Sequence, residues 1–222
     1  MSASIFTIAF AEGVTLTRWT GAWQQRQPGI PLEFINTDSA SQVTALFDGG
    51  ADVSFVRLPV INDNLSVIPL YAESAVVVLP KGHALADADT VTLADLQAEE
   101  RVSAELLAPD AVELVAAGGG IVILPQAIAR LHSRKDVVAR LVIDGPETQI
   151  AIAWFAEQTT AEIEEFVGIV RGRTARSSRA GNQPDEPKPA PKARTQKPQK
   201  AQPKARVLGK RYTKPRKPRG SR

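Results

Sequence analysis

The sequence predicts an α/β fold built around a parallel sheet. Over residues 4–59, strand and helix patterns alternate in the order strand, helix, strand, helix, strand. That order implies parallel strands joined by right-handed crossovers. Charge divides the chain as well: residues 1–170 carry 9 Lys and Arg against 22 Asp and Glu, whereas residues 171–222 carry 18 against 2. We therefore expect a folded acidic body followed by a basic arm.

The strands of the body are predicted from short β-branched or apolar runs between turn signals. They lie at residues 4–10, 31–36 and 51–58, in two runs within 65–85, and at 121–125, 137–143 and 148–155.

Helices are predicted where apolar residues recur every three or four positions. They lie at residues 15–27, 38–50, 92–97, 110–117, 126–132 and 160–174. Trp19 and Trp23 lie four residues apart on the first helix and could border a cleft, form a dimer seam or pack in the core. Core packing is favoured for them and for Trp154, because large aromatic side chains at such positions are usually buried.

Composition excludes several classes of protein. The chain has no Cys, which excludes disulfides and thiolate chemistry. No apolar run approaches the ~20 residues of a membrane span. The start, "MSASIFTIAFAEG", lacks the basic segment of a secretory signal. We expect a cytoplasmic protein that makes no membrane contact.

Five segments then occur in a fixed order: "GGADVSFVRLP", "LSVIPLYAESAVVVLPKGHALA", "VTLADL", "ELVAAGGGIVILPQAIARL" and "DVVARLVIDGPETQIAIAW". Together they make residues 4–172 resemble the effector-binding domain of LysR-type transcriptional regulators. The resemblance implies a type 2 periplasmic-binding-protein-like fold, in which two α/β subdomains are joined by two crossing strands and enclose a small-molecule cleft. We place the crossings near Val78–Pro80 and Leu141–Asp144.

The resemblance also sets domain boundaries. Residues 1–173 form the effector-binding-like domain, with subdomain I at about 1–79 and 144–173 and subdomain II at about 80–143; residues 174–222 form a disordered basic tail. Two departures from the family are expected. The first strand starts at about Ser4 with no winged helix-turn-helix ahead of it, and the short segment between Leu96 and Asp110 predicts a shortened subdomain II.

Polar residues follow the first three strands, where an open parallel sheet binds its ligands. Helix N-termini offer free N–H groups to anions, and an Arg at a strand end adds a planar donor fork for a carboxylate. We predict that a small organic anion is bound by Thr15, Thr17, Asn36, Ser39 and Arg57. The alternative is that Thr15 and Ser39 only cap helices and that Arg57 pairs with Asp38 or Asp63.

Nothing in the sequence assembles a catalytic or metal site. His83 and His132 are the only histidines and lie far apart, so neither metal spacing nor a nucleophile–base pair can be argued. His83 is interpreted as a structural residue of a turn. Gly118–Gly120 precede a strand and lack the Lys of a phosphate loop, so they are expected to end a helix and form a tight turn. We expect no cofactor, no metal and no enzymatic activity.

The basic arm combines Lys and Arg with many Pro, which keeps cationic groups spread along an extended string. Such a segment binds polyanions by counterion release and contacts phosphates more than bases. The predicted nucleic-acid contacts are Lys204, Arg206, Lys210, Arg211, Lys214, Arg216, Lys217 and Arg219. Two alternatives are a solubilising tail and a tail that docks on its own acidic body.

The sequence thus favours a metabolite-sensing module of a LysR-like regulator, with weakly specific nucleic-acid contact through its arm. The second interpretation is a ligand-incompetent accessory protein that pairs with other regulators, as a homodimer or heterodimer through subdomain I. An enzyme on a binding-protein fold is the least supported class.

Overall fold

The computed structural model describes residues 4–103 and 105–172. The predicted nucleic-acid contacts of the arm lie outside the described residues. The strands are β1 Phe6–Ala11, β2 Leu32–Thr37, β3 Val53–Arg57, β4 Leu65–Glu73, β5 Ala75–Pro80, β6 Thr90–Val91, β7 Val122–Pro125, β8 Val137–Val142 and β9 Thr148–Phe155.

Five helices lie among these strands in the described residues. They are α1 Thr17–Arg26, α2 Thr44–Phe47, α3 Ala108–Ala116, α4 Gln126–Leu131 and α5 Ala161–Val170, with a 3₁₀ turn, η1, at Ala156–Gln158. Within the described part of the chain, no helix is both long and apolar enough to cross a membrane.

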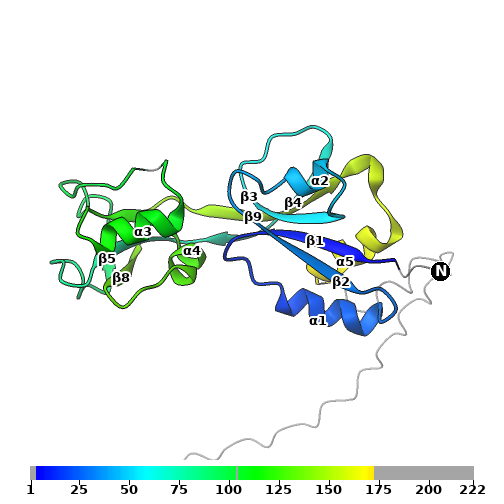
Figure 1. Cartoon of the computed structure of the whole chain (residues 1–222), viewed down its shortest axis with the longest axis horizontal. Helices are drawn as coiled ribbons and strands as arrows, with labels where there is room; N and C mark the ends of the chain where they lie inside the picture. The colour runs from blue at the N-terminus through cyan, green and yellow to red at the C-terminus, as the bar shows by residue number, and fades with distance from the viewer. Residues whose placement is uncertain (1–3, 104, 173–222) are drawn as a thin grey trace, which may run out of the picture. The chain divides into compact units, whose positions relative to one another are not determined.

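Two separate sheets define two lobes (Figure 1). Lobe I holds the five-stranded sheet, in the order β2-β1-β3-β9-β4, with α1, α2 and α5; lobe II holds the four-stranded sheet, in the order β6-β8-β5-β7, with α3 and α4. Strand β1 pairs in parallel with β2 and β3, which confirms the predicted strand–helix alternation. The α/β fold with two lobes is the one that the family resemblance implied.

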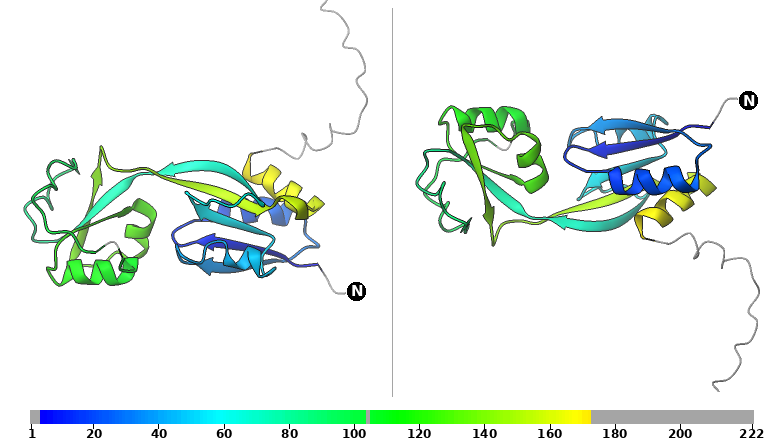
Figure 2. Two further views of the ribbon diagram at one scale, coloured as in Figure 1. Left: turned by 90° about the horizontal axis from the view of Figure 1, so that it is seen from above. Right: turned by 90° about the horizontal axis from the view of Figure 1, so that it is seen from below.

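The chain passes between the lobes along two neighbouring paths, which Figure 2 shows running side by side. The outward path changes sheet at Ser74, because β4 ends at Glu73 and β5 begins at Ala75. The sequence had placed this crossing near Val78–Pro80, which is wrong. Val78 instead pairs with both β7 and β8 and is only 1% exposed, so the apolar run of β5 belongs to the lobe II core. The return path lies between β8 and β9, next to the predicted position.

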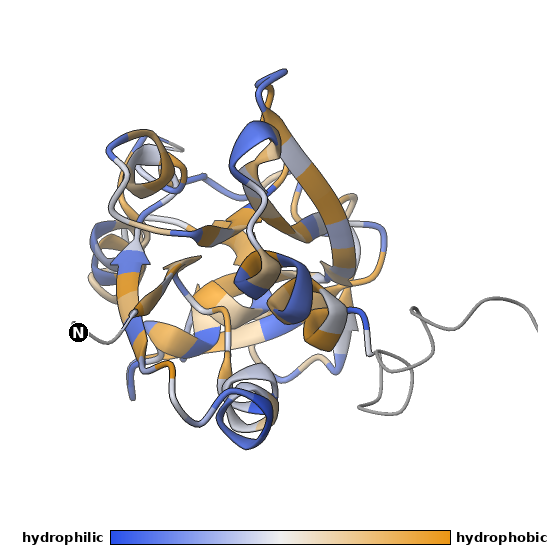
Figure 3. Ribbon diagram, turned by 90° about the vertical axis from the view of Figure 1, so that its right-hand side faces the viewer, coloured by the Kyte–Doolittle hydropathy of each residue, from blue (hydrophilic) through white to orange (hydrophobic). Residues whose placement is uncertain are grey.

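The core of lobe I is built on stacked aromatic rings. Trp23 stacks on Phe6 and Trp19 stacks on Phe55, each with ring centroids 4.7 Å apart. Trp23 is fully buried and Trp19 and Trp154 are nearly so, which confirms the core interpretation of all three tryptophans. In Figure 3 the strands of this lobe are mostly coloured as hydrophobic. The packed sheet therefore supplies a rigid platform for the residues at its strand ends.

Two predicted helices are largely absent. Residues 92–97 form turns, and only Thr44–Phe47 of the predicted helix 38–50 is helical. In each case an Asp carboxylate accepts local hydrogen bonds: Asp95 from the Thr92 N–H and hydroxyl, and Asp38 from the N–H groups of Ala40 and Ser41. At Asp38 these bonds offer the loop an alternative to helical hydrogen bonds.

The glycine run after α3 behaves as expected. Gly118 follows the helix at φ +84°, and Gly120 has φ +114°. A Cβ at Gly120 would lie 2.5 Å from the carbonyl oxygen of Glu100. The prediction of a helix end and a tight turn is confirmed.

Candidate functional site

Two cavities lie where the lobes meet. One, of about 430 Å³, is lined by Thr15 and Asn36 of lobe I and by Ala127 and Arg130 of α4, among others. A second cavity, of about 270 Å³, is also lined by Thr15, Ala127 and Arg130, and it extends to Glu73, where the chain passes from lobe I to lobe II. The two volumes together are in the range of small-molecule sites.

The lobes touch beside these cavities. Gly13 has φ +80°, and a Cβ on it would lie 3.0 Å from the Cβ of Ala127. Glu12 Oε2 and His132 Nε2 are 3.7 Å apart across the same junction. Gly13 is thus required by both its backbone conformation and its distance from α4.

The structure brings some of the predicted site residues together and separates others. Thr15 lines both interlobe cavities, and Asn36 lines the larger. Thr17 lines a different cavity of about 380 Å³, between the start of α1 and Phe34. Ser39 and Arg57 are not among the residues that line these cavities. Of the five predicted residues, Thr15 and Asn36 therefore line the same interlobe cavity.

The alternative assignment of Thr15 and Ser39 as helix caps is wrong. The residue before α1 is Leu16 and the residue before α2 is Val43, and neither makes a side-chain cap bond. The first-turn N–H groups of Trp19 and Thr20 bond to the Leu16 carbonyl. The Thr15 hydroxyl is thus left outside the capping pattern and can serve a ligand.

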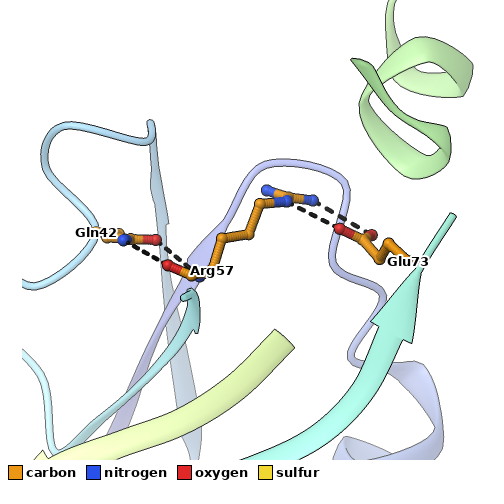
Figure 4. Close-up of polar contacts among 3 residues, drawn as sticks. All are labelled: Gln42, Arg57 and Glu73. Atoms are coloured by element: carbon orange, nitrogen blue, oxygen red, sulfur yellow. Dashed lines mark hydrogen bonds and ion pairs between the residues drawn. The ribbon is translucent and has the colours of Figure 1, made fainter. Parts of the chain in front are cut away.

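Arg57 is the last residue of β3, but its guanidinium does not line either interlobe cavity. It is 9% exposed and forms a two-bond contact with Glu73, in which Nε donates to Oε2 at 2.9 Å and Nη2 donates to Oε1 at 3.3 Å (Figure 4). The alternative interpretation was right that Arg57 is paired and wrong about the partner. Arg57 influences the smaller cavity through Glu73, which lines it.

Gln42 fixes the backbone of Arg57, and sequence reasoning missed it. Its amide Nε2 donates to the Arg57 carbonyl at 2.9 Å, and the Arg57 N–H donates to its Oε1 at 2.8 Å (Figure 4). The Ser54 hydroxyl also donates to the Gln42 carbonyl at 2.7 Å. The loop before α2 is thus tied to β3.

Arg130 was also missed. Its position in "QAIARL" is the polar face of a short amphipathic helix, and a solvent-facing Arg has the same pattern. Arg130 lines both interlobe cavities and makes no ion pair with any residue that the structure describes. Three arginines of the described body do have acidic partners: Arg26 pairs with Glu165, Arg57 with Glu73 and Arg134 with Asp136.

The site also has the partly exposed phenol of Tyr71, which is 38% exposed. Burial raises the pKa of Tyr71, and the negative charge of Glu73 raises it further, while Arg57 acts in the opposite direction. Tyr71 therefore keeps its proton near neutral pH and remains a hydrogen-bond donor at the edge of the smaller cavity.

His83 is not part of the site. His83 Nε2 lies 3.0 Å from Glu99 Oε2, and its Nδ1 accepts the Leu85 N–H, which confirms its structural role in a turn. Over residues 4–103 and 105–172, no three His, Cys, Asp or Glu side chains are grouped so as to hold a metal ion.

Comparison with known proteins finds similarity to one family of regulators. Residues 4–106 match the family model described as the LysR substrate binding domain. The Hca operon transcriptional activator HcaR of Escherichia coli (strain K12) is 24% identical over 200 residues, which cover 76% of this chain and 68% of that protein. A probable hydrogen peroxide-inducible genes activator of Mycobacterium leprae is 27% identical over 158 residues, 58% of this chain and about half (51%) of the relative.

A solved structure shows the same fold. The effector binding domain of a BenM variant aligns with a TM-score of 0.64 at 20% sequence identity, covering 79% of this chain and 96% of that one. At this level of identity the likeness concerns the fold. Residues 4–106 therefore match the LysR substrate binding domain model, and the described chain has the two-lobed fold of the effector-binding domains of LysR-type regulators.

Proposed function

We propose that this protein senses a small organic anion between its lobes and that it does so as part of a LysR-type transcriptional regulator. The observation that carries the proposal is the convergence of Thr15, Asn36 and Arg130 on one cavity of about 430 Å³, with Arg130 forming no ion pair among the described residues. These groups come from both lobes, so one ligand can contact both.

The chemistry of these three side chains suits a carboxylate. A guanidinium donates two parallel N–H bonds to it, and a threonine hydroxyl and an asparagine amide add neutral donors. Because Arg130 is on α4 of lobe II and the other two are on lobe I, an anion between them favours arrangements in which the lobes are close. That difference in affinity between arrangements is what a ligand needs to shift a conformational equilibrium.

The peroxide-related names of some relatives suggest a different signal, which this chain is not equipped to read through sulfur. Reversible peroxide sensing by a thiol begins with a cysteine thiolate. The sequence contains no Cys and a single Met. A bound metabolite fits the residues of this site better.

The test is a thermal-shift screen of the full chain against a panel of small organic acids, followed by Arg130→Gln. The matched control is Lys135→Gln, which removes the same charge from an exposed position of lobe II outside the cavity. We expect at least one acid to raise Tm, and we expect Arg130→Gln to remove most of that shift while Lys135→Gln leaves it intact. No shift with any acid would overturn the proposal.

We also propose that the basic arm contacts nucleic acid through its phosphates. The support is compositional: 18 Lys and Arg against 2 acidic residues over residues 171–222. In a full-length chain with Lys204, Arg206, Lys210, Arg211, Lys214, Arg216, Lys217 and Arg219 all changed to Gln, DNA mobility shifts should weaken strongly. If six phosphates are engaged, log K should fall against log salt with a slope of about −5 in the original chain. Equal DNA binding by both proteins would contradict the arm's role.

Pairing through lobe I is a second proposed role. Strand β2 is an edge strand of its sheet, and its Phe34 is 51% exposed. An unpaired edge with an apolar side chain is a ready site for a second chain. Light scattering of the full chain tests this role, because Phe34→Glu should convert a dimer to a monomer; a mass unchanged by the substitution would argue against pairing at β2.

A further inference from the structure

The junction between the lobes holds an ionisable pair. Glu12 directly follows β1 of lobe I, and His132 directly follows α4 of lobe II. Glu12 Oε2 and His132 Nε2 are 3.7 Å apart, and the two side chains are 31% and 19% exposed. This distance is too long for a hydrogen bond, so the two groups face each other without being bonded.

The ring nitrogen on this side of His132 is buried, yet it has no hydrogen-bond partner among the described residues. A buried polar nitrogen without a partner is costly. When imidazole takes up a proton, both of its nitrogens become donors, and a hydrogen bond between two charged groups is about twice as strong as a neutral one. A proton on His132 therefore makes Nε2 the donor of a charge-assisted bond to Glu12, once the gap between them closes by about 1 Å.

The elements packed against α4 are α3, β5 and β7. Strands β5 and β7 contain no ionisable side chain, and α3 contributes Asp110 and Glu113. Glu113 acts electrostatically on Arg134, which itself bonds to Asp136. These groups are thus balanced within lobe II.

The remaining charged neighbours of His132 in the chain are cationic. Arg130 lies two positions earlier on α4, and Lys135 lies three positions later and is exposed. Among the described residues, Glu12 is the acidic side chain that lies within 4.0 Å of His132. The charge state of His132 therefore acts mainly on a contact with the other lobe.

The backbone at this junction allows the lobes to come close. Gly13, next to Glu12, has no Cβ, and a Cβ there would lie 3.0 Å from the Cβ of Ala127 on α4. The chain passes between the lobes along two neighbouring paths (Figure 2). A connection of this kind can act as a hinge between two packed lobes.

We propose that Glu12 and His132 form a proton-dependent contact between the lobes. Histidine gains its proton as pH falls from about 8 to about 5. The proton strengthens the contact and so shifts the protein toward arrangements in which the lobes are close. His132 is in this sense a positioning residue, and the contact needs no ligand.

A link to the anion follows, and this link rests on the proposed function. The proton and an anion in the interlobe cavity would both favour close lobes, so each should strengthen the binding of the other.

The experiment measures the separation of the lobes in the full chain without any organic acid. Because the chain has no Cys, Gln24→Cys on α1 and Ala117→Cys after α3 give one nitroxide label for each lobe, both at exposed positions. Double electron–electron resonance at about pH 5.5 and about pH 8 spans the titration of a histidine. We expect the ratio of short to long distances to be about 3-fold higher at the lower pH, as for a partly exposed charge pair.

Variants of the labelled chain identify the groups responsible. Glu12→Gln and His132→Gln should each abolish the pH response, whereas His132→Arg should favour short distances at both pH values because its charge is permanent. The matched control is His83→Gln, which removes the histidine that faces Glu99 within lobe II and should leave the response intact. Far-UV circular dichroism and Tm check that each variant folds.

Several results would overturn the contact. They are distances that do not change with pH, a response that survives both Glu12→Gln and His132→Gln, and a response that disappears in His83→Gln. Since no organic acid is present, these outcomes are independent of the anion sensor, which the thermal-shift screen tests separately.

Discussion

Removing either member of the Arg57–Glu73 pair should destabilise the protein far more than removing a surface pair. Both residues are less than 10% exposed, and their two contacts of 2.9 and 3.3 Å leave little room for water. Two unit charges about 4 Å apart interact by about 4 kcal/mol at an effective dielectric constant near 20. A lone buried charge also loses its hydration, so Glu73→Gln or Arg57→Met should each cost about 3–5 kcal/mol of unfolding free energy.

The double variant distinguishes pairing from packing. Once both charges are gone, no unpaired charge remains buried, so Arg57→Met/Glu73→Gln should be less destabilised than the sum of the two single variants. We expect a coupling energy of about 2–3 kcal/mol, near the upper end of the range for contacting residues. Urea unfolding of the full chain, followed by far-UV circular dichroism, gives the four free energies.

The chain provides a matched control in Arg134 and Asp136. They make the same kind of contact, at 3.1 and 3.2 Å, but their side chains are 44% and 38% exposed. Solvent screening should hold the coupling in Arg134→Met/Asp136→Asn well below the coupling between Arg57 and Glu73. Additive effects within about 0.5 kcal/mol at Arg57 and Glu73 would refute the reasoning, because they would show that the buried contact contributes nothing specific.

Three further predictions test the surroundings of the site. Glu73→Gln removes a negative charge that raises the pKa of Tyr71, so ultraviolet titration should show a lower pKa for Tyr71 in this variant. Tyr71→Phe serves as the control that distinguishes the signal of Tyr71 from that of Tyr212. Because the pKa of Tyr71 is raised in the folded state, the stability that this shift contributes is complete below the phenol's ordinary pKa and is lost as pH rises through the folded-state pKa. In urea unfolding, the free energy of unfolding of Tyr71→Phe should therefore decrease less at alkaline pH than that of the original chain. Gly13→Ala strains a backbone at φ +80° and forces a Cβ to 3.0 Å from the Cβ of Ala127, so it should lower the free energy of unfolding by about 1–2 kcal/mol and weaken anion affinity. Adding Ala127→Gly should restore part of the affinity but little of the stability. Unchanged stability and unchanged affinity in Gly13→Ala would contradict the contact between the lobes.

Local patterns were sufficient for much of lobe I. Alternating apolar residues located β1, β2 and β3, and helical spacing located Trp19 and Trp23 in the core, because these signals depend on neighbours a few residues away. The carboxyl ends of β1 and β2 also indicated Thr15 and Asn36, which do line a common cavity.

Contacts that depend on distant segments were not accessible in this way. Arg57 reaches Glu73 across β9, whose Ile150 pairs with both Arg57 and Tyr71. Strand β9 is supplied by a segment more than 90 positions later in the chain, at Thr148–Phe155, so no local pattern identifies the partner of Arg57. Arg130 was missed for the same reason, because it comes from the other lobe and only the tertiary fold brings it beside Thr15.

The position of a bound anion tests the central proposal most directly. Amide NMR spectra of the isotopically labelled full chain, titrated with the organic acid that most raises Tm, report which residues the ligand reaches. Asn36, Ala127 and Arg130 all line the larger interlobe cavity, so their resonances should shift together and saturate at one Kd. Shifts confined to other residues, or shifts that Arg130→Gln leaves unchanged, would contradict a sensor built on this cavity.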